Sequence, residues 1–237
     1  MSYPNIIYEV IYEKNIGTIY IINTSRRILY IYINGSPNQK GCTYTALNEI
    51  SSTLNNEGIE TEIYYIGKEP VAPCRACRAC GKIGRCVIND KVNDFVEYAR
   101  NFDGYVIGSP VHYGSAAGGL IPFLDRAFFV DYMSGHDSFR HKPGTAIVSA
   151  RRAGTTATID QLNKYFQINQ MPIISGRYWN MVYGQNPEEV KQDKEGMQNM
   201  RILAKNLAYH LKCKEAAAKA GIVPPAVENV EYTNFIH

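Results

Sequence analysis

The sequence predicts an α/β fold in which a parallel sheet carries helices on both faces. Apolar, β-branched segments alternate with helical patterns along most of the chain, as parallel strands joined by helical crossovers require. The first core strand, 28–33, is apolar at nearly every position, which is typical of a strand buried on both faces. The length of 237 residues is sufficient for one sizeable domain of this kind.

The expected elements follow one another in order. A β-hairpin extension, 1–27, precedes the domain at 28–214, and a C-terminal tail occupies 215–237. The hairpin has strands at 6–12 and 18–23 and a turn at 13–17. The domain has five expected strands, at 28–33, 60–66, 105–108, 145–149 and 172–175. Its expected helices are 46–56, 90–102, 120–132, 155–166 and, after an aromatic insertion at 178–184, a long helix from 187 to about 214, which alanines extend toward Gly221.

Composition and charge exclude several classes of function. Hydrophobic residues make up 45% of the chain and charged residues 20%, as in ordinary globular proteins. The net charge of +3 is small and the basic residues are scattered, so no nucleic-acid partner is expected. No apolar run has membrane-spanning length, and the N-terminal residues lack the basic region of a signal peptide. We therefore expect no membrane association and a cytoplasmic location.

Four of the six cysteines lie within one short loop, 74–86, with the spacing C-x2-C-x2-C-x5-C. Disulfides are disfavoured because cysteines three residues apart are awkward partners. Structural zinc sites usually hold two cysteine pairs separated by a longer span, whereas successive x2 spacings suit an iron–sulfur cluster. The pattern favours a cluster, with zinc ligation and free thiols as alternatives, on Cys74, Cys77, Cys80 and Cys86. The basic residues between them either offset its negative charge or are simply solvated: Arg75, Arg78, Lys82 and Arg85.

Three further loops follow predicted strands and are expected to meet at the carboxyl edge of the sheet, where open parallel sheets bind ligands. The first, 34–45, is rich in Gly, Ser, Thr and Asn and leads into a helix, which suits phosphate binding or a helix cap alone. The second, 109–119, carries His112 and Tyr113 and suits either a planar ring or a packed loop without ligand. The third, 150–156, has two arginines that suit a phosphate or an anionic ring.

With these loops, the chain resembles the flavodoxin-like NAD(P)H-dependent FMN reductases and, within them, the iron–sulfur flavoproteins. The resemblance covers roughly 28–214, and the hairpin departs from it. It rests on the order and spacing of four motifs: Asn34-Gly35-Ser36-Pro37, the four-cysteine motif, Gly108-Ser109-Pro110-Val111-His112-Tyr113-Gly114 and Phe123-Leu124-Asp125-Arg126.

The resemblance implies a flavodoxin-like oxidoreductase or electron-transfer protein with non-covalently bound FMN and a nearby 4Fe-4S cluster on the four cysteines. It implies NAD(P)H or a small redox protein as electron donor, a small molecule or redox protein as acceptor, and a homodimer or homotetramer. An FMN or quinone-type reductase without a cluster is the alternative, and a non-enzymatic binding module is a third interpretation.

The same resemblance assigns the cofactor contacts. The chemistry belongs to FMN, so no side chain has to act as nucleophile or general base, and His112 is first a wall for the flavin and second a proton donor. The expected phosphate contacts are Ser36, Asn38, Thr43 and Thr45, and Tyr44 is a further expected cofactor contact of the same loop. The expected ring contacts are Pro110, Val111, His112, Tyr113, Gly114, Ser115, Ala150, Arg151, Arg152 and Gly154.

Overall fold

Strand β3, Leu29–Asn34, lies inside a parallel sheet, paired with β4, Glu60–Tyr65, on one side and with β5, Gly104–His112, on the other. The computed structural model describes residues 8–13, 18–23, 28–229, 231, 233 and 235. Five residues of β3, Tyr30 to Asn34, are buried, as expected for a strand covered on both faces.

The order of the parallel strands is β4-β3-β5-β7-β8, where β7 is Gly144–Ala150 and β8 is Met181–Tyr183. Counted along the domain this order is 2-1-3-4-5, the flavodoxin-like arrangement. The predicted fold class, five parallel strands between helical layers, is therefore confirmed. A short strand, β6, Ser115–Ala116, adds an antiparallel pairing at the end of β5.

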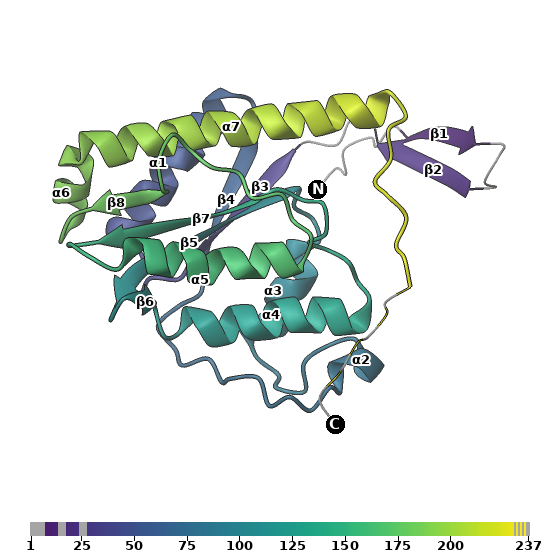
Figure 1. Ribbon diagram of the computed structural model, residues 1–237, viewed down its shortest axis with the longest axis horizontal. Helices are drawn as coiled ribbons and strands as arrows, with labels where there is room; N and C mark the ends of the chain where they lie inside the picture. The colour runs from purple at the N-terminus through teal and green to yellow at the C-terminus, as the bar shows by residue number, and fades with distance from the viewer. Residues whose placement is uncertain are drawn as a thin grey trace, which may run out of the picture.

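Helices cover both faces of the sheet (Figure 1). On one face lie α1, Cys42–Asn56, α6, Pro187–Gln192, and α7, Lys194–Lys219. On the other face lie α3, Lys91–Ala99, α4, Leu120–Ser134, and α5, Thr155–Ile168. Among the described residues, no helix is both long and apolar enough to cross a membrane.

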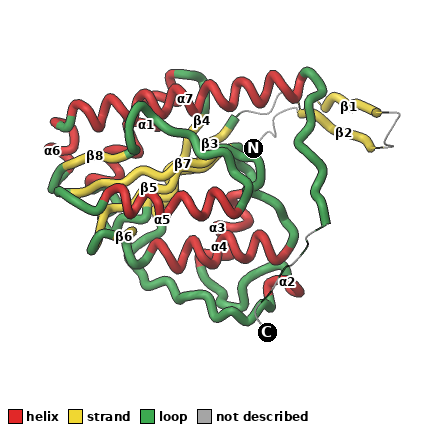
Figure 2. The backbone as a smooth tube through the Cα atoms, viewed as in Figure 1, coloured by secondary structure: helices red, strands yellow, loops and turns green. Residues whose placement is uncertain are grey.

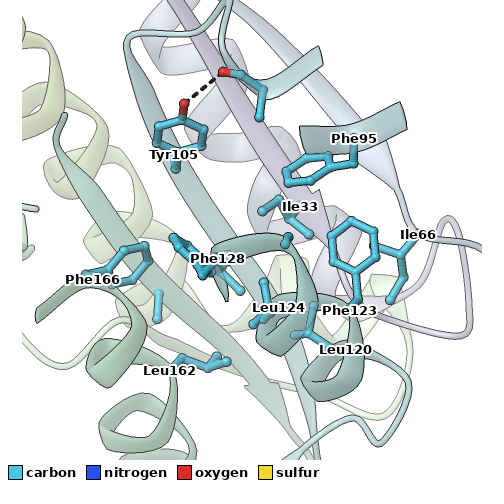
Figure 3. Close-up of a cluster of buried hydrophobic side chains, with 14 of the residues drawn as sticks. Ile33, Ile66, Phe95, Tyr105, Leu120, Phe123, Leu124, Phe128, Leu162 and Phe166 are labelled. Atoms are coloured by element: carbon cyan, nitrogen blue, oxygen red, sulfur yellow. Dashed lines mark hydrogen bonds between the residues drawn. The ribbon is translucent and has the colours of Figure 1, made fainter. Parts of the chain in front are cut away.

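Aromatic side chains fill the core between the sheet and the second helical layer. Figure 3 shows Phe95 of α3 and Phe123 of α4 pointing toward each other beside Ile33, with ring centroids 4.9 Å apart. The buried hydroxyl of Tyr105 donates to the Ala99 carbonyl oxygen at 2.8 Å, so this polar group is satisfied within the core (Figure 3).

The loop between β4 and α3 contains the cysteines and is interrupted by the four-residue helix α2, Cys80–Ile83 (Figure 2). It passes α4, whose residues Phe129 and Val130 line the same hollow as the cysteines. Helix α3 follows the loop in the sequence. Its N-cap is Asp90, whose Oδ1 accepts a hydrogen bond from the Val92 N–H. One end of the cysteine loop is thus fixed by a helix cap.

The prediction of the fifth strand at 172–175 is wrong. Ile173 forms only an isolated bridge with Gly144 and is 36% exposed, whereas Val182 of β8 is fully buried against α7. The fifth strand of the sheet is therefore β8, because the helical layer covers its apolar side chains. The expected aromatic insertion, 178–184, therefore contains the true edge strand.

The long helix expected from 187 to 214 is also corrected. It is two helices separated at Asp193, whose backbone leaves the helical region at φ −71° and ψ 80°. The Asp193 carboxylate accepts from the Gly196 N–H at 2.9 Å and so caps α7. Helix α7 then continues to Lys219 because alanines favour helix, so 215–219 of the expected tail are helical.

Smaller boundary differences occur elsewhere. Helix α1 begins at Cys42 instead of 46, α3 ends at Ala99 instead of 102, and β5 continues to His112 instead of 108. At the N-terminus, β1, Tyr8–Glu13, pairs antiparallel with β2, Thr18–Asn23. Residues 14–17 of the expected turn lie outside the described residues, as do residues 6 and 7 of its first strand.

We expect Gly104→Ala to destabilise the fold. A Cβ at this position would lie 2.2 Å from Cε1 of the buried Tyr30 ring, so the strand or the ring must move. Overpacking of this kind costs about 1–3 kcal/mol. Urea unfolding should show that loss, while the control Gly118→Ala, with open space around its Cβ, should stay near wild type. Equal midpoints for both variants would contradict this account.

Candidate functional site

The three predicted loops meet around one cleft of about 340 Å³ at the carboxyl ends of β3, β5 and β7. This volume lies within the range of small-molecule sites. Eight of the expected cofactor contacts line it: Ser36, Asn38, Thr43, Pro110, Val111, His112, Ala150 and Arg151. The structure thus brings together residues more than one hundred positions apart in the sequence.

The first loop is held by Asn34, a fully buried residue at the end of β3. Its Oδ1 accepts from the Ser36 N–H at 3.1 Å, and its Nδ2 donates to the Gln39 carbonyl oxygen at 2.9 Å. Ser36 Oγ in turn accepts from the Asn38 N–H at 3.1 Å. These bonds fix the loop before any ligand binds.

Helix α1 directs its N-terminus at the cleft. The first-turn N–H groups of any α-helix have no intrahelical partner, and here the N-cap, Gly41, has no side chain to accept from them, so they favour an anion. Thr43 is buried, with its Oγ1 2.9 Å from Ser149 Oγ. Thr45 instead donates to the Gly41 carbonyl oxygen at 3.1 Å, and neither it nor Tyr44 lines the cleft.

The second loop is a two-residue turn between β5 and β6. Tyr113 and Gly114 have φ of 52° and 74°, and His112 pairs with Ser115, a geometry typical of a type I′ hairpin. Tyr113 projects fully into solvent, and the Ser115 hydroxyl donates to Gln161 Oε1 at 2.8 Å. Of this turn only His112 lines the cleft, so Tyr113, Gly114 and Ser115 lie outside it.

The third loop packs closely against the second. Gly154 has φ of +92°, and a Cβ there would lie 2.8 Å from Gly114 Cα and 2.9 Å from Val111 Cγ1. Its role is therefore close backbone packing that keeps the two loops together. Ala150 and Arg151 line the cleft, whereas Arg152 and Gly154 do not.

Sequence reasoning missed several residues of the cleft. Gly184 and Gln185 follow β8, so the wrong assignment of the fifth strand hid them. Cys42 Sγ donates to the Gly184 carbonyl oxygen at 3.6 Å, and burial raises the pKa of this thiol, so it is neutral near pH 7. The complete set of additional lining residues is Pro37, Gly41, Cys42, Ser149, Gly184 and Gln185.

The four cysteines line a second, narrow hollow together with Arg126 of α4. Cys74 and Cys77 are exposed, Cys86 is half-buried, and Cys80 is buried at the start of α2. Burial raises the pKa of the Cys80 thiol, and the neighbouring Cys77 and Cys86 act in the same direction. A bound cation would reverse this by stabilising thiolates.

The chemistry of these four thiols suits the ligation of an iron–sulfur cluster. Within the described parts of the chain, no three His, Cys, Asp or Glu side chains are grouped closely enough for one ion. A cluster places its thiolates on separate irons and is anionic, which suits four thiols around a hollow that also contains the buried guanidinium of Arg126.

An ion pair between the buried Arg126 and the half-buried Asp90 borders this hollow. Arg126 Nη1 lies 2.6 Å from Asp90 Oδ2, and the Arg126 side chain is 1% exposed. Burial alone would raise the pKa of the Asp90 carboxyl, but hydrogen bonds from Arg126 and the Val92 N–H lower it below its ordinary value. Asp90 therefore stays ionised and holds the guanidinium in place.

The cleft and the cysteine loop are neighbours on the same rim. A hollow of about 430 Å³ lies between them, lined by Pro37 and His112 of the cleft and by Pro70 and Val71 at the start of the cysteine loop. This hollow therefore connects the cleft with the start of the cysteine loop, while the cysteines themselves line the separate, narrow hollow.

Comparison with known proteins identifies the family. The sequence model of the NADPH-dependent FMN reductase family matches residues 27–186, more than half of the chain. The chain belongs to this family. It is therefore an FMN-dependent oxidoreductase, as the resemblance implied.

Individual proteins also match the chain, by sequence or by fold. An iron–sulfur flavoprotein of Methanocaldococcus jannaschii is 29% identical over 191 residues, covering 77% of this chain and 96% of the relative. The crystal structure of RosB with bound 8-demethyl-8-formylriboflavin-5′-phosphate matches with a TM-score of 0.62 at 16% identity, over 89% and 94% of the chains. An archaeal flavodoxin matches with a TM-score of 0.53 at 11% identity, over 78% and 99%. These two structures show the fold alone.

We expect Asn34→Ala to loosen the first loop of this family member. The change leaves the Ser36 N–H and the Gln39 carbonyl without their buried partner, at a cost of about 1–3 kcal/mol. Hydrogen exchange of the Ser36 amide should accelerate. Asn206→Ala, which removes an exposed bond to the Ser175 carbonyl, should change stability little. Unchanged exchange in Asn34→Ala would contradict the role given to Asn34.

Proposed function

We propose that the protein passes electrons between a reduced donor, a 4Fe-4S cluster on Cys74, Cys77, Cys80 and Cys86, and FMN bound in the cleft. The observation that carries this proposal is the hollow of about 430 Å³ that is lined both by cleft residues Pro37 and His112 and by Pro70 and Val71 at the start of the cysteine loop. The relative named an iron–sulfur flavoprotein supports it over most of both chains.

The phosphate of FMN would bind at the first loop. Ser36 Oγ and the free N–H groups of the first turn of α1 offer donors, and the positive end of the helix dipole favours the anion. Asn38 and Thr43 complete this side of the cleft. The residues present therefore match a phosphate monoester in charge and hydrogen bonding.

The ring system would lie against the second and third loops. Pro110 and Val111 offer an apolar surface, and Arg151 offers positive charge beside a ring that becomes anionic on reduction. His112, which lines both the cleft and the neighbouring hollow of about 430 Å³, serves as a wall and as the candidate proton donor. Bound FMN would supply both hydride and single-electron chemistry.

The electron donor is proposed to be NAD(P)H or a small redox protein, and the acceptor a small molecule or redox protein, in a cytoplasmic homodimer or homotetramer. A reductase without a cluster is the second candidate. The exposure of Cys74 and Cys77 favours it, because exposed thiols on a loop need no metal.

We expect protein purified without oxygen to be yellow-brown, to contain iron and to bleach with dithionite. Cys77→Ser should lower the iron content because it removes one thiolate ligand. Cys213→Ser, which removes an exposed cysteine outside the loop, should retain wild-type iron. Yellow wild-type protein without iron would support the cluster-free reductase, and colourless protein after addition of FMN would reject both candidates.

FMN binding is tested by the double change Ser36→Ala with Thr43→Ala. Loss of both hydroxyls from the cleft should weaken binding at least tenfold, or about 1.4 kcal/mol, by fluorescence titration. Thr53→Ala is the control, since it removes a hydrogen-bonded threonine hydroxyl from the same helix, 2.8 Å from the Glu49 carbonyl oxygen and away from the cleft. Unchanged affinity in the double variant would remove these hydroxyls from the phosphate site.

A further inference from the structure

Arg126 is buried deeply for an arginine, with its guanidinium directed at the cysteine loop. It projects from the middle of α4, where an apolar side chain would pack without any cost of desolvation. A buried cation at this position requires compensation, and its partners indicate what it does.

The guanidinium contacts both ends of the cysteine loop. Nη1 donates to the Ala72 carbonyl oxygen at 3.3 Å, just before the first cysteine. Nη2 donates to the Ile88 carbonyl oxygen at 3.0 Å, just after the last. Asp90 accepts from Nη1 at 2.6 Å and from Nη2 at 2.8 Å, which fixes the plane of the guanidinium.

The remaining contacts go to a single sulfur. Nε and Nη2 both donate to Cys86 Sγ, at 3.4 and 3.3 Å. The backbone of Cys86 is held as well, since its N–H donates to Asn93 Oδ1 at 2.8 Å and its carbonyl accepts from Asn93 Nδ2 at 3.1 Å. The position of Cys86 is therefore set by two side chains before any metal binds.

The other end of the loop differs. Cys74 and Cys77 are exposed, and Ala76 and Arg78 beside them adopt positive φ of 52° and 55°. The hollow is therefore asymmetric, with an anchored, hydrogen-bonded sulfur at one side and solvent-facing sulfurs at the other.

Resting on the proposed function, we propose that Arg126 is a positioning residue that presents the sulfur of Cys86 to the cluster and raises the reduction potential of that cluster. Hydrogen bonds to a ligand sulfur and a nearby positive charge both stabilise the more negative, reduced state. Asp90 offsets part of this charge, but the guanidinium contacts the sulfur directly, so the cation dominates at Cys86.

Three variants separate the contributions of Arg126. Arg126→Gln removes the charge, and Arg126→Lys keeps a charge but loses the fork that reaches the sulfur and Asp90 together. Arg126→Met combined with Asp90→Asn leaves no unpaired buried charge, and asparagine retains the capping oxygen for α3. This double variant guards against a simple failure to fold, which circular dichroism would reveal.

Arg85→Gln is the matched control. Arg85 lies on the same loop and also loses one positive charge on substitution, but it is exposed and hydrogen-bonds Asn89. Solvent screens its charge, so the cluster should respond little.

The measurements are made on anaerobically reconstituted full-length protein. Dye-mediated redox titration of the visible spectrum should give a lower midpoint potential for Arg126→Gln and the double variant, and an intermediate one for Arg126→Lys. Iron loss to a chelator should be roughly 10- to 100-fold faster in the first two, as for other changes beside metal ligands. Arg85→Gln should match the wild type in both measurements.

Two outcomes would overturn the proposal, and they differ in whether the cluster itself is rejected as well. A wild-type protein that takes up no iron overturns both the cluster and the role of Arg126. A wild type with a normal cluster, and Arg126 variants with the same potential and the same rate of iron loss, overturns the role of Arg126 alone.

Discussion

Parallel strands must all point the same way, and the rest of this structure depends on that constraint. Because β3, β5 and β7 pair in parallel, their carboxyl ends fall on one edge of the sheet. Three loops that are distant in sequence therefore meet around one cleft. The buried Asn34 continues β3 into this edge and orders the first loop through its own amide. Strand β3 thus places the first loop at the cleft, and its last residue, Asn34, also holds that loop by hydrogen bonds.

The same constraint places the cysteine loop beside the cleft. It follows β4, the neighbour of β3, so it starts from the same edge, and Val71 borders the hollow that His112 also lines. Arg126 then ties the loop to α4, while Asp90 joins it to α3. In this member of an FMN reductase family, the loop that carries the thiol-rich hollow thus starts from the sheet edge that carries the cleft.

Much of the fold could be predicted because its signals are local. Continuous apolar runs identified β3, β5 and β7, and the end of α7 near Gly221 followed from the alanines that precede that glycine. The fifth strand was predicted wrongly because two segments could have filled the same position at the edge of the sheet. Residues 172–175 carry apolar side chains like those of β8, but only the position of α7 decides which segment is covered. The break at Asp193 was missed because an aspartate within a helical pattern also fits an exposed helical position.

The sequence by itself determined the alternation of strands and helices, the three loops at the strand ends and the four cysteines, since these depend on the order and spacing of residues. Only the tertiary structure decided which side chains within those loops face the cleft. The turn at Tyr113 and Gly114 sends the tyrosine into solvent and leaves His112 at the wall. It also decided that Arg126, forty residues beyond Cys86, donates to that sulfur. Such contacts arise from the packing of α4 against the loop, and no local pattern in the chain specifies them.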